Sequence, residues 1–355
     1  MTTKMNLTIV VALLLALVQP LEAWSNPGSS TTKLSSLGKK STALDVLTDL
    51  NRSNQLAFPE GGVAVVTGGN AGIGAVSCKT LALAGMQVVL CARNVEAAQK
   101  VVNEWPSHIS ARVEIQELDL ANLASVQQAA KAISEKHPDI SVLLNNAGVM
   151  APPTKLETAQ QIELQFGTNH VGHHMWTRLL LPHVNDKGRI VTVASTAHTF
   201  PKSTDIQWQP EDYSGWREYG QSKLANILFA KRVQELLMQQ GKMDIQSVCL
   251  HPGVIGTSLW RYLPKLVQPL TRLFADKTVE QGAATNVYCC LAERIQGAAY
   301  YSDCQVAQPS STAEDAQLRK DLWDYTEAVI AEKGFEMPRE LVRDGKVTVE
   351  AHDTV

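Results

Sequence analysis

Short apolar runs alternate with segments of helical spacing along most of the chain, and this alternation restricts the possible folds more than any other feature. The runs that predict strands are Val63–Thr67, Gln87–Ala92, Val113–Leu118, Ser141–Asn145, Arg189–Ala194 and Ile245–Leu250. The segments that predict helices between them are Ala71–Leu83, Val95–Glu104, Leu123–Lys136, Thr158–His183 (one helix or two) and Tyr219–Gln239. Because the strands are apolar throughout, both faces of the sheet must be covered. The pattern predicts an α/β fold with a doubly wound parallel sheet and helices on both faces.

The first predicted strand runs directly into a glycine-rich turn, TGGNAGIG, which opens a helix. Gly68 permits a tight turn, Gly72 lets the backbone approach a pyrophosphate, and Gly74 lets the helix lie close to the strand. The free N–H groups at the helix start would then face the phosphates. A turn with only a structural role is the alternative, but the strand–turn–helix context favours a Rossmann-type dinucleotide site. The residues expected to contact the cofactor here are Thr67, Gly68, Asn70, Gly72, Ile73 and Gly74.

Four further motifs follow in an order that resembles the short-chain dehydrogenase/reductase family. They are Asn145–Gly148 (NNAG), Ser195 at a strand end, Tyr219–Lys223 (YGQSK) and His251–Gly253 (HPG). The resemblance covers roughly residues 60–330. The strings IELQFGTNHVGH, YGQSKLANIL and YSDCQV look like the retinol-dehydrogenase-like branch, which includes the WW-domain oxidoreductase and a short-chain dehydrogenase of the chloroplast inner envelope. This resemblance implies an oxidoreductase that acts on CH–OH donors and binds a nicotinamide cofactor.

Proton transfer in such a reaction is expected at a tyrosine. Tyr219 and Lys223 are four residues apart and so share one helix face. A free tyrosine has a pKa near 10, and a neighbouring ammonium, together with the positive nicotinamide, is expected to lower it. A hydroxyl at Ser195 can hydrogen-bond the substrate oxygen as charge develops. The resemblance makes Ser195, Tyr219 and Lys223 catalytic, gives Lys223 the nicotinamide ribose, and assigns Asn169 the support of a proton-relay water.

The end of the second predicted strand bears on the choice of cofactor. It reads CARN, and no Asp or Glu occurs from Gln87 to Val95. An acidic residue there would bind the ribose 2′-hydroxyl of NAD, whereas an arginine accommodates the 2′-phosphate of NADP. Arg93 therefore predicts NADP(H), with a solvated surface arginine as the alternative. The other expected cofactor contacts are Asp119 at the adenine, Asn146, Ala147 and Gly148 near the adenosine ribose, and Tyr219, Lys223, Pro252, Gly253 and Thr257.

Charge and cysteine content exclude other classes of site. The formal net charge is −3 and no run of five basic residues occurs, so we expect no nucleic-acid partner. The six cysteines form no CxxC pair, which predicts buried free thiols and no structural zinc. His170, His173 and His174 lack a cysteine or carboxylate partner in the pattern. We therefore expect them to be packing or surface residues and expect no metal site.

Two segments are expected to border the substrate. His198–Arg217 is inserted between Ser195 and Tyr219, and the apolar segment Val254–Gly282 covers the substrate in relatives. Within it Leu259, Leu263, Leu266 and Leu270 have helical spacing, with Leu273 and Phe274 beyond. These residues predict a small lipophilic carbonyl or alcohol as the substrate. The alternative is a face that contacts a membrane surface or a second subunit in a homodimer.

The N-terminal region has the composition of a targeting leader. Lys4 precedes the apolar run Leu7–Val18, which is too short for a comfortable membrane span but suits a signal peptide. Trp24–Leu44 is rich in Ser and Thr and has no acidic residue. We expect a signal-like segment over 1–23, a transit-like segment over 24–57, one domain over 58–335, with a helix at Ala313–Lys333, and a tail over 336–355. This leader predicts a plastid, with the endoplasmic reticulum membrane or lumen as the alternative. An NADP-sensing regulatory partner at a membrane or import complex is the alternative function.

Overall fold

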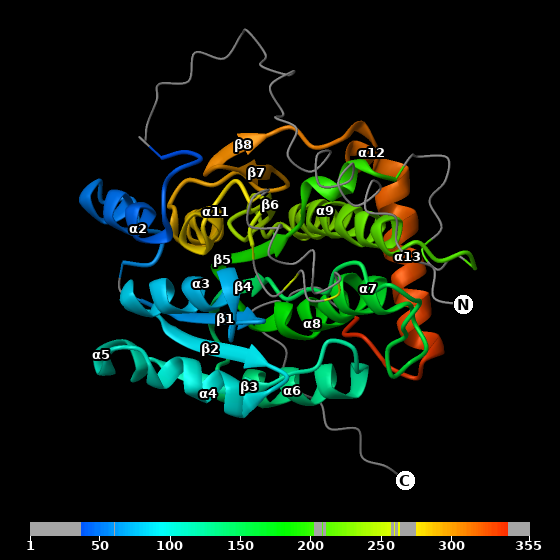
Figure 1. Ribbon diagram of the computed structural model, residues 1–355, viewed down its shortest axis with the longest axis horizontal. Helices are drawn as coiled ribbons and strands as arrows, with labels where there is room; N and C mark the ends of the chain where they lie inside the picture. Colours follow the sequence, from blue (N-terminus) through cyan, green and yellow to red (C-terminus); the bar gives the residue numbers. More distant parts are fainter. Residues whose placement is uncertain are drawn as a thin grey trace, which may run out of the picture.

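The computed structural model describes residues 37–59, 61–201, 208, 211–256, 259, 262 and 275–339. An eight-stranded sheet in the order β3-β2-β1-β4-β5-β6-β7-β8 lies at its centre (Figure 1). The strands are β1 (Val63–Thr67), β2 (Gln87–Ala92), β3 (Val113–Glu117), β4 (Ile140–Asn145), β5 (Val184–Val193), β6 (Gln246–His251), β7 (Tyr300–Ser302) and β8 (Gln305–Ala307). All neighbouring pairs are parallel except β7 and β8. The predicted doubly wound parallel sheet is confirmed.

Helices cover both faces of this sheet. One face carries α2 (Ala43–Arg52), α3 (Gly72–Leu83), α4 (Val95–Asn103), α5 (Ser107–Ser110) and α11 (Val279–Leu291). The other carries α6 (Leu123–Lys136), α7 (Leu164–Phe166), α8 (Gly172–Leu180), α9 (Gly215–Gln239), α12 (Ser311–Glu314) and α13 (Ala316–Glu332). The alternation of strand side chains explains the two cores, because Ala64 and Val66 of β1 face the first layer and Val65 faces the second. Continuous apolar strands are therefore required.

The region predicted as one or two helices over Thr158–His183 is divided more finely. After α7 the chain forms one π-helical turn, Gly167–Val171, then α8 and a 3-10 turn, Leu181–His183. A second 3-10 turn, Thr196–Thr199, follows β5. The π-helical turn contains Asn169, so the irregularity lies where a functional residue is expected.

The predicted domain boundary at residue 58 is too late. Helix α2 begins with a capping box, in which the side chains of Thr42 and Asp45 bond each other's backbone N–H, and its Val46 and Leu50 are buried against α11 and α3. The folded part therefore includes the chain from Leu37 onward. At the other end it extends past 335, since Arg178 donates a hydrogen bond to the Pro338 carbonyl.

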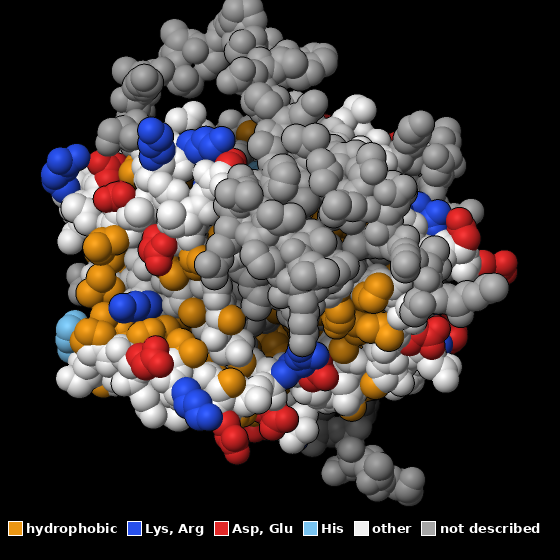
Figure 2. All heavy atoms as spheres, in the orientation of Figure 1, with side chains coloured by type: hydrophobic (Ala, Val, Ile, Leu, Met, Phe, Trp, Pro, Cys, Tyr) orange, Lys and Arg blue, Asp and Glu red, His pale blue; other side chains and the backbone are white. Residues whose placement is uncertain are grey.

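The expected signal-like segment, most of the transit-like segment and the end of the C-terminal tail lie outside the described residues, and they stay predictions. Within the described ranges, no helix combines the length and apolarity that a membrane crossing requires. Figure 2 shows Lys and Arg side chains interspersed with Asp and Glu over the described part of one face.

Candidate active site

The carboxyl ends of β1 and β4 lie side by side where the strand order reverses, which is the position at which open α/β sheets bind ligands. A pocket opens there. It is lined by Gly68, Asn70, Ala71, Gly72, Ile73, Gly74, Ala92, Arg93, Leu118, Asp119, Leu120, Asn146, Ala147, Gly148, Val149, Met150, Thr168, Val193, Ala194, Ser195, Tyr219, Lys223, His251, Pro252, Gly253, Val254, Ile255 and Leu259. Of the predicted site residues, Thr67 and Asn169 do not line it, and Thr257 lies outside the described residues.

The glycine-rich turn has the shape that a phosphate group requires. Gly68 and Gly72 adopt positive φ angles of 66° and 54°. A Cβ on Gly74 would lie 2.3 Å from the Gly68 carbonyl oxygen and 2.5 Å from Asn146 Nδ2, so this position has room for hydrogen only. Ala71 precedes α3 and gives it no side-chain cap, and the first turn of α3 contains no acidic residue. The first N–H groups of α3 can therefore bind an anion in the pocket.

Thr67 supports this turn from behind. Its Oγ1 accepts hydrogen bonds from the backbone N–H of Asn146 (2.9 Å) and Ala147 (3.0 Å) and lies 2.8 Å from His173 Nε2. With both acceptor positions used, the Thr67 hydroxyl donates to His173 Nε2, and His173 Nδ1 donates to the Asn169 carbonyl (3.0 Å). Burial lowers the pKa of His173 to about 4, so the ring is neutral. His173, predicted as a packing or surface residue, is buried and links β1 to the π-helical turn.

Ser195, Tyr219 and Lys223 meet at the ends of β5 and α9. The Ser195 side chain lies near enough to Tyr219 to act on its pKa, and Ser195 Oγ accepts the Ala197 N–H (3.2 Å). Lys223 Nζ donates to the Val193 carbonyl (3.0 Å) and lies 5.8 Å from the centroid of the Tyr219 ring. Tyr219 and Lys223 are each 4% exposed. The three polar groups thus share one largely dehydrated corner of the pocket.

The lowering of the Tyr219 pKa that is expected beside Lys223 and a bound nicotinamide stays a prediction. In the protein alone, burial raises the pKa of Tyr219 to about 12, with Ser195 acting in the opposite direction. Burial also lowers the pKa of Lys223 to about 8. The Lys223 ammonium is directed at the Val193 carbonyl, and burial outweighs its effect on the phenol. Tyr219 is therefore protonated at neutral pH and can donate a proton.

The Asn169 carboxamide forms three hydrogen bonds with other groups of the protein. It donates to the Val149 carbonyl and to Ser222 Oγ (both 2.9 Å) and accepts the Val149 N–H (2.8 Å). A Cβ on Gly148 would lie 3.3 Å from Asn169 Oδ1 and 3.6 Å from Lys223 Nζ. The asparagine side chain therefore holds the loop after β4 beside Lys223, and its proton-relay role stays a prediction.

The far end of the pocket carries the residues predicted to distinguish the cofactors. Arg93 is exposed at the end of β2, and it forms no ion pair or hydrogen bond with another described residue. Asp119, the one acidic residue in the lining, accepts the Ala121 N–H (3.0 Å). Thr168 was not predicted. It is 8% exposed, and its Oγ1 has no hydrogen-bond partner within the described part of the chain.

An apolar cluster forms the other end. It contains Met150, Ala197, Trp216, Tyr219 and Val254, with Ala151, Phe200 and Leu259 packed against it. Two aromatic residues of the predicted insertion, Phe200 and Trp216, thus lie in the cluster that contains Tyr219. A third, Trp208, stacks on Phe166 in the larger core, with ring centroids 5.5 Å apart. Most of the predicted leucine stripe, from Leu263 to Phe274, lies outside the described residues.

The other two histidines of the predicted group, His170 and His174, and the cysteines lie in the core. His174 of α8 contacts Glu327 (2.7 Å), and His170 of the π-helical turn contacts Thr326 (3.0 Å), so both elements are joined to α13. All six cysteines are buried free thiols, as predicted. Among the described residues, no group of three or more His, Cys, Asp or Glu side chains is placed to hold a metal ion.

Comparison with known proteins is consistent with this geometry. Residues 62–266 match the family model described as short chain dehydrogenase. The chain is 34% identical over 311 residues to the chloroplastic short-chain dehydrogenase TIC 32 B of Brassica napus, covering 82% of this chain and 93% of the relative. It is 35% identical over 274 residues to retinol dehydrogenase 11 of Mus musculus, covering 75% and 85%.

WW domain-containing oxidoreductases are also similar to the chain. Among solved structures, an uncharacterized protein from Mycobacterium paratuberculosis superimposes with a TM-score of 0.64 at 30% identity, covering 81% of this chain and 98% of that one.

Proposed function

Since the chain belongs to the short-chain dehydrogenase family of oxidoreductases, we propose that it is an NADP(H)-dependent enzyme that transfers a hydride between nicotinamide and a lipophilic carbonyl or alcohol. The observation that carries this proposal is that Ser195, Tyr219 and Lys223 line the same pocket as the glycine-rich turn, with Lys223 Nζ 5.8 Å from the Tyr219 ring centroid. Nothing in a purely structural domain requires a tyrosine, a serine and a lysine to share a dehydrated pocket corner. The start of α3 has no side-chain cap, so its free N–H groups support the proposal of a bound pyrophosphate.

The chemistry follows from the three side chains. The nicotinamide, when bound, supplies or accepts the hydride. A carbonyl oxygen placed between the Ser195 and Tyr219 hydroxyls accepts a hydrogen bond from Ser195 as negative charge develops on it. Tyr219, protonated at neutral pH, donates its proton to that oxygen. The Lys223 ammonium, close to the ring, stabilises the phenolate that results. In the oxidation direction the same groups remove a proton from the alcohol.

NADP(H) is favoured over NAD(H) by the end of β2. Arg93 lines the pocket, and its guanidinium is not paired with another described residue. Strand β2 ends without a carboxylate that would repel a 2′-phosphate.

A lipophilic substrate is favoured by the cluster around Tyr219, in which Met150, Trp216 and Val254 offer no charged group. The proposed substrate is therefore a small apolar aldehyde or ketone, or the matching alcohol.

A plastid location is proposed from the composition of the leader and from the similarity to a relative whose name places it in the chloroplast. The similarity to retinol dehydrogenase 11 keeps the endoplasmic reticulum as the alternative. Localising a fluorescent fusion made at the C-terminus, with and without residues 1–36, separates these two locations.

The function is tested with purified protein, NADPH or NADH, and a series of aldehydes and ketones of increasing chain length. We expect NADPH consumption, little or no NADH consumption, and a catalytic efficiency that rises with chain length, because each buried methylene contributes about 0.8 kcal/mol. Tight NADPH binding without turnover on any member of the series would instead favour the sensor function.

A further inference from the structure

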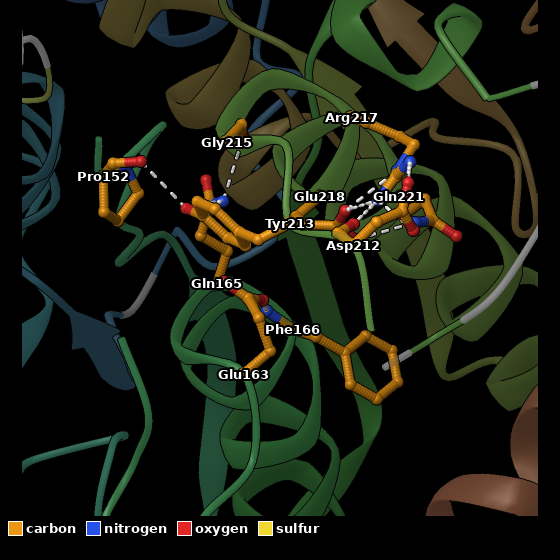
Figure 3. A network of polar contacts seen from close by, with 10 residues as sticks. All are labelled: Pro152, Glu163, Gln165, Phe166, Asp212, Tyr213, Gly215, Arg217, Glu218 and Gln221. Atoms are coloured by element: carbon orange, nitrogen blue, oxygen red, sulfur yellow. Dashed lines mark hydrogen bonds and ion pairs between the residues drawn. The ribbon is translucent and has the colours of Figure 1, made fainter. Parts of the chain in front are cut away.

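A buried glutamine joins the two chain segments that form the apolar end of the pocket. Gln165, in α7, is fully buried. Its Oε1 accepts the Ala151 N–H (2.7 Å), and its Nε2 donates to the Gly215 carbonyl (2.9 Å) and to the Tyr213 hydroxyl (3.3 Å). The Tyr213 hydroxyl in turn donates to the Pro152 carbonyl (2.9 Å). Figure 3 shows Gln165 and Tyr213 between these two segments.

These contacts hold the segments unusually close together. A Cβ on Gly215 would lie only 2.7 Å from the Pro152 carbonyl oxygen. Ala151 has a positive φ of 46°, a conformation that an alanine adopts only when its surroundings enforce it. The hydrogen bond from the Ala151 N–H to Gln165 is part of that enforcement. The glutamine amide and the hydrogen bond from the Tyr213 hydroxyl to the Pro152 carbonyl are two side-chain links between these segments.

The joined segments carry two residues that surround Tyr219. Met150 immediately precedes Ala151 and lines the pocket, and Trp216 immediately follows Gly215 and is not part of the lining. Both belong to the cluster around Tyr219, and the Trp216 and Tyr219 rings lie edge to face with centroids 6.5 Å apart. The placement of Met150 and Trp216 around Tyr219 therefore depends on the contacts of Gln165 and Tyr213.

The charged neighbours of this region make separate contacts. Arg217 pairs with Asp212 and with Glu218, whose other oxygen accepts a hydrogen bond from Gln221. Glu163 accepts the Phe166 N–H through Oε2 (2.7 Å). The Gln165 side chain also lies close to the Glu163 carboxyl and acts to lower its pKa, against the larger effect of burial, so the amide that crosses between the two segments has one carboxylate neighbour (Figure 3).

We propose that Gln165 and Tyr213 are positioning residues that hold Met150 on the pocket wall and Trp216 against Tyr219, and so determine which carbonyl compounds reach Tyr219. This inference rests on the proposed carbonyl reductase function. It predicts a pocket that admits linear chains and disfavours branching next to the carbonyl carbon, because Met150 packs beside Tyr219 there. Neither residue touches the reacting atoms; both act through the segments that they join.

The test uses Gln165→Met, which keeps side-chain length and removes every hydrogen bond of the amide. The matched control is Gln234→Met. Gln234 is 3% exposed on α9 and also bonds backbone, accepting the Ser247 N–H (2.6 Å) and donating to the Ile245 carbonyl (3.3 Å), but it does not line the pocket. Tyr213→Phe is the milder variant, which removes one hydroxyl.

The assay compares a linear aldehyde with an isomer branched beside the carbonyl. For Gln165→Met we expect KM for the linear aldehyde to rise at least about fivefold, kcat to change less than twofold, and the preference for the linear isomer to fall at least about fivefold. Tyr213→Phe should move in the same direction by a smaller factor. NADPH affinity should be unchanged. Equal shifts in Gln165→Met and Gln234→Met, or an unaltered preference between the isomers, would overturn the proposal.

Hydrogen exchange measured by mass spectrometry provides a readout that does not need turnover. Gln165→Met should speed exchange at the Ala151 and Trp216 segments at least about tenfold, while Gln234→Met should leave these segments unchanged. A wild-type protein without activity on any carbonyl would refute the proposed function, whereas unchanged exchange in Gln165→Met would refute the positioning role.

Discussion

The two ends of the pocket are built by different means. At the cofactor end, the shape comes from backbone: strand ends at the switch point, glycines at positions that exclude a Cβ, and an uncapped helix start. At the substrate end, the shape comes from side chains of three separate segments, joined by Gln165 and Tyr213. Backbone features can be specified by a few residue types at fixed spacing, while side-chain contacts between distant segments cannot. The cofactor end should therefore be rigid and general, and the substrate end adjustable.

Tyr219→Phe should give the largest effect, because it removes the reacting proton and leaves both ends of the pocket intact. Turnover should fall at least about a hundredfold, the usual size of acid–base catalysis, with the NADPH dissociation constant nearly unchanged. Steady-state kinetics and fluorescence titration of NADPH check the two parts. Near-normal turnover of the Phe variant would contradict the assignment of Tyr219.

Arg93→Ala tests whether the cofactor end of the pocket discriminates between NADPH and NADH. A lost charge-assisted contact to the 2′-phosphate should weaken NADPH binding by about 1.5–3 kcal/mol, or roughly ten- to a hundredfold. NADH lacks that phosphate and is the internal control, so its affinity should stay constant. Calorimetric titration of both cofactors measures the difference, and equal affinity of the native protein for NADPH and NADH would show that Arg93 is only a surface residue.

Lys223→Met tests how the buried charge of Lys223 affects the free energy of unfolding. The pKa of Lys223 is lowered from 10.5 to about 8 by burial, so below pH 8 its charge opposes folding. The Met variant without cofactor should exceed the wild type in free energy of unfolding at pH 7 by on the order of 2 kcal/mol.

That difference should shrink as the pH rises from 8 to 10.5, because the folded wild type then loses its buried charge while the unfolded chain still carries one. Urea unfolding of both proteins across this range measures the difference, and groups common to both cancel. A variant that is less stable than the wild type at pH 7 would contradict the prediction.

Thr168→Val should give the smallest effect, at the cofactor end. The Thr168 hydroxyl is buried without a described partner and lines the pocket, so a bound cofactor is the group that can satisfy it. Replacing it with an isosteric methyl should weaken NADPH binding by about 1 kcal/mol, or roughly fivefold. Thr192→Val is the matched control, since the Thr192 hydroxyl is equally unpaired and buried but lies outside the pocket lining. Equal losses in both variants would indicate a general effect on folding.

The same contrast between the two ends explains what the sequence could predict. Strands β1–β6 and the pocket residues at their ends follow from apolar runs and glycine spacing, which are local signals. Gln165, Thr168 and His173 could not be assigned, because their roles depend on partners brought near by the fold, such as Ala151 and Thr67. The sequence therefore predicts most residues of the cofactor end of the pocket but few of the contacts that shape the substrate end.

Two of the longer helices, α2 and α11, were missed for different reasons. Helix α11 is largely buried between neighbouring elements and so has a weak amphipathic pattern, whereas α2 is amphipathic with one exposed face but lies within a Ser- and Thr-rich segment that was interpreted as a leader. Each nevertheless begins with a capping box, Thr42 with Asp45 and Thr278 with Gln281. This short signal could have located both helices.

The contact between α2 and α11 has a consequence for synthesis of the chain. Leu37 and Lys40, just before α2, accept hydrogen bonds from Gln305 and Gln281, and Lys40 and Gln281 are 241 positions apart. A ribosome that adds about 5–20 residues per second makes the second partner roughly 12–50 s after the first. During that interval α2 lacks the α11 part of its docking surface and has only α3 to pack against, so the ten-residue helix stays marginally stable. Complete docking of α2 therefore takes place late in translation.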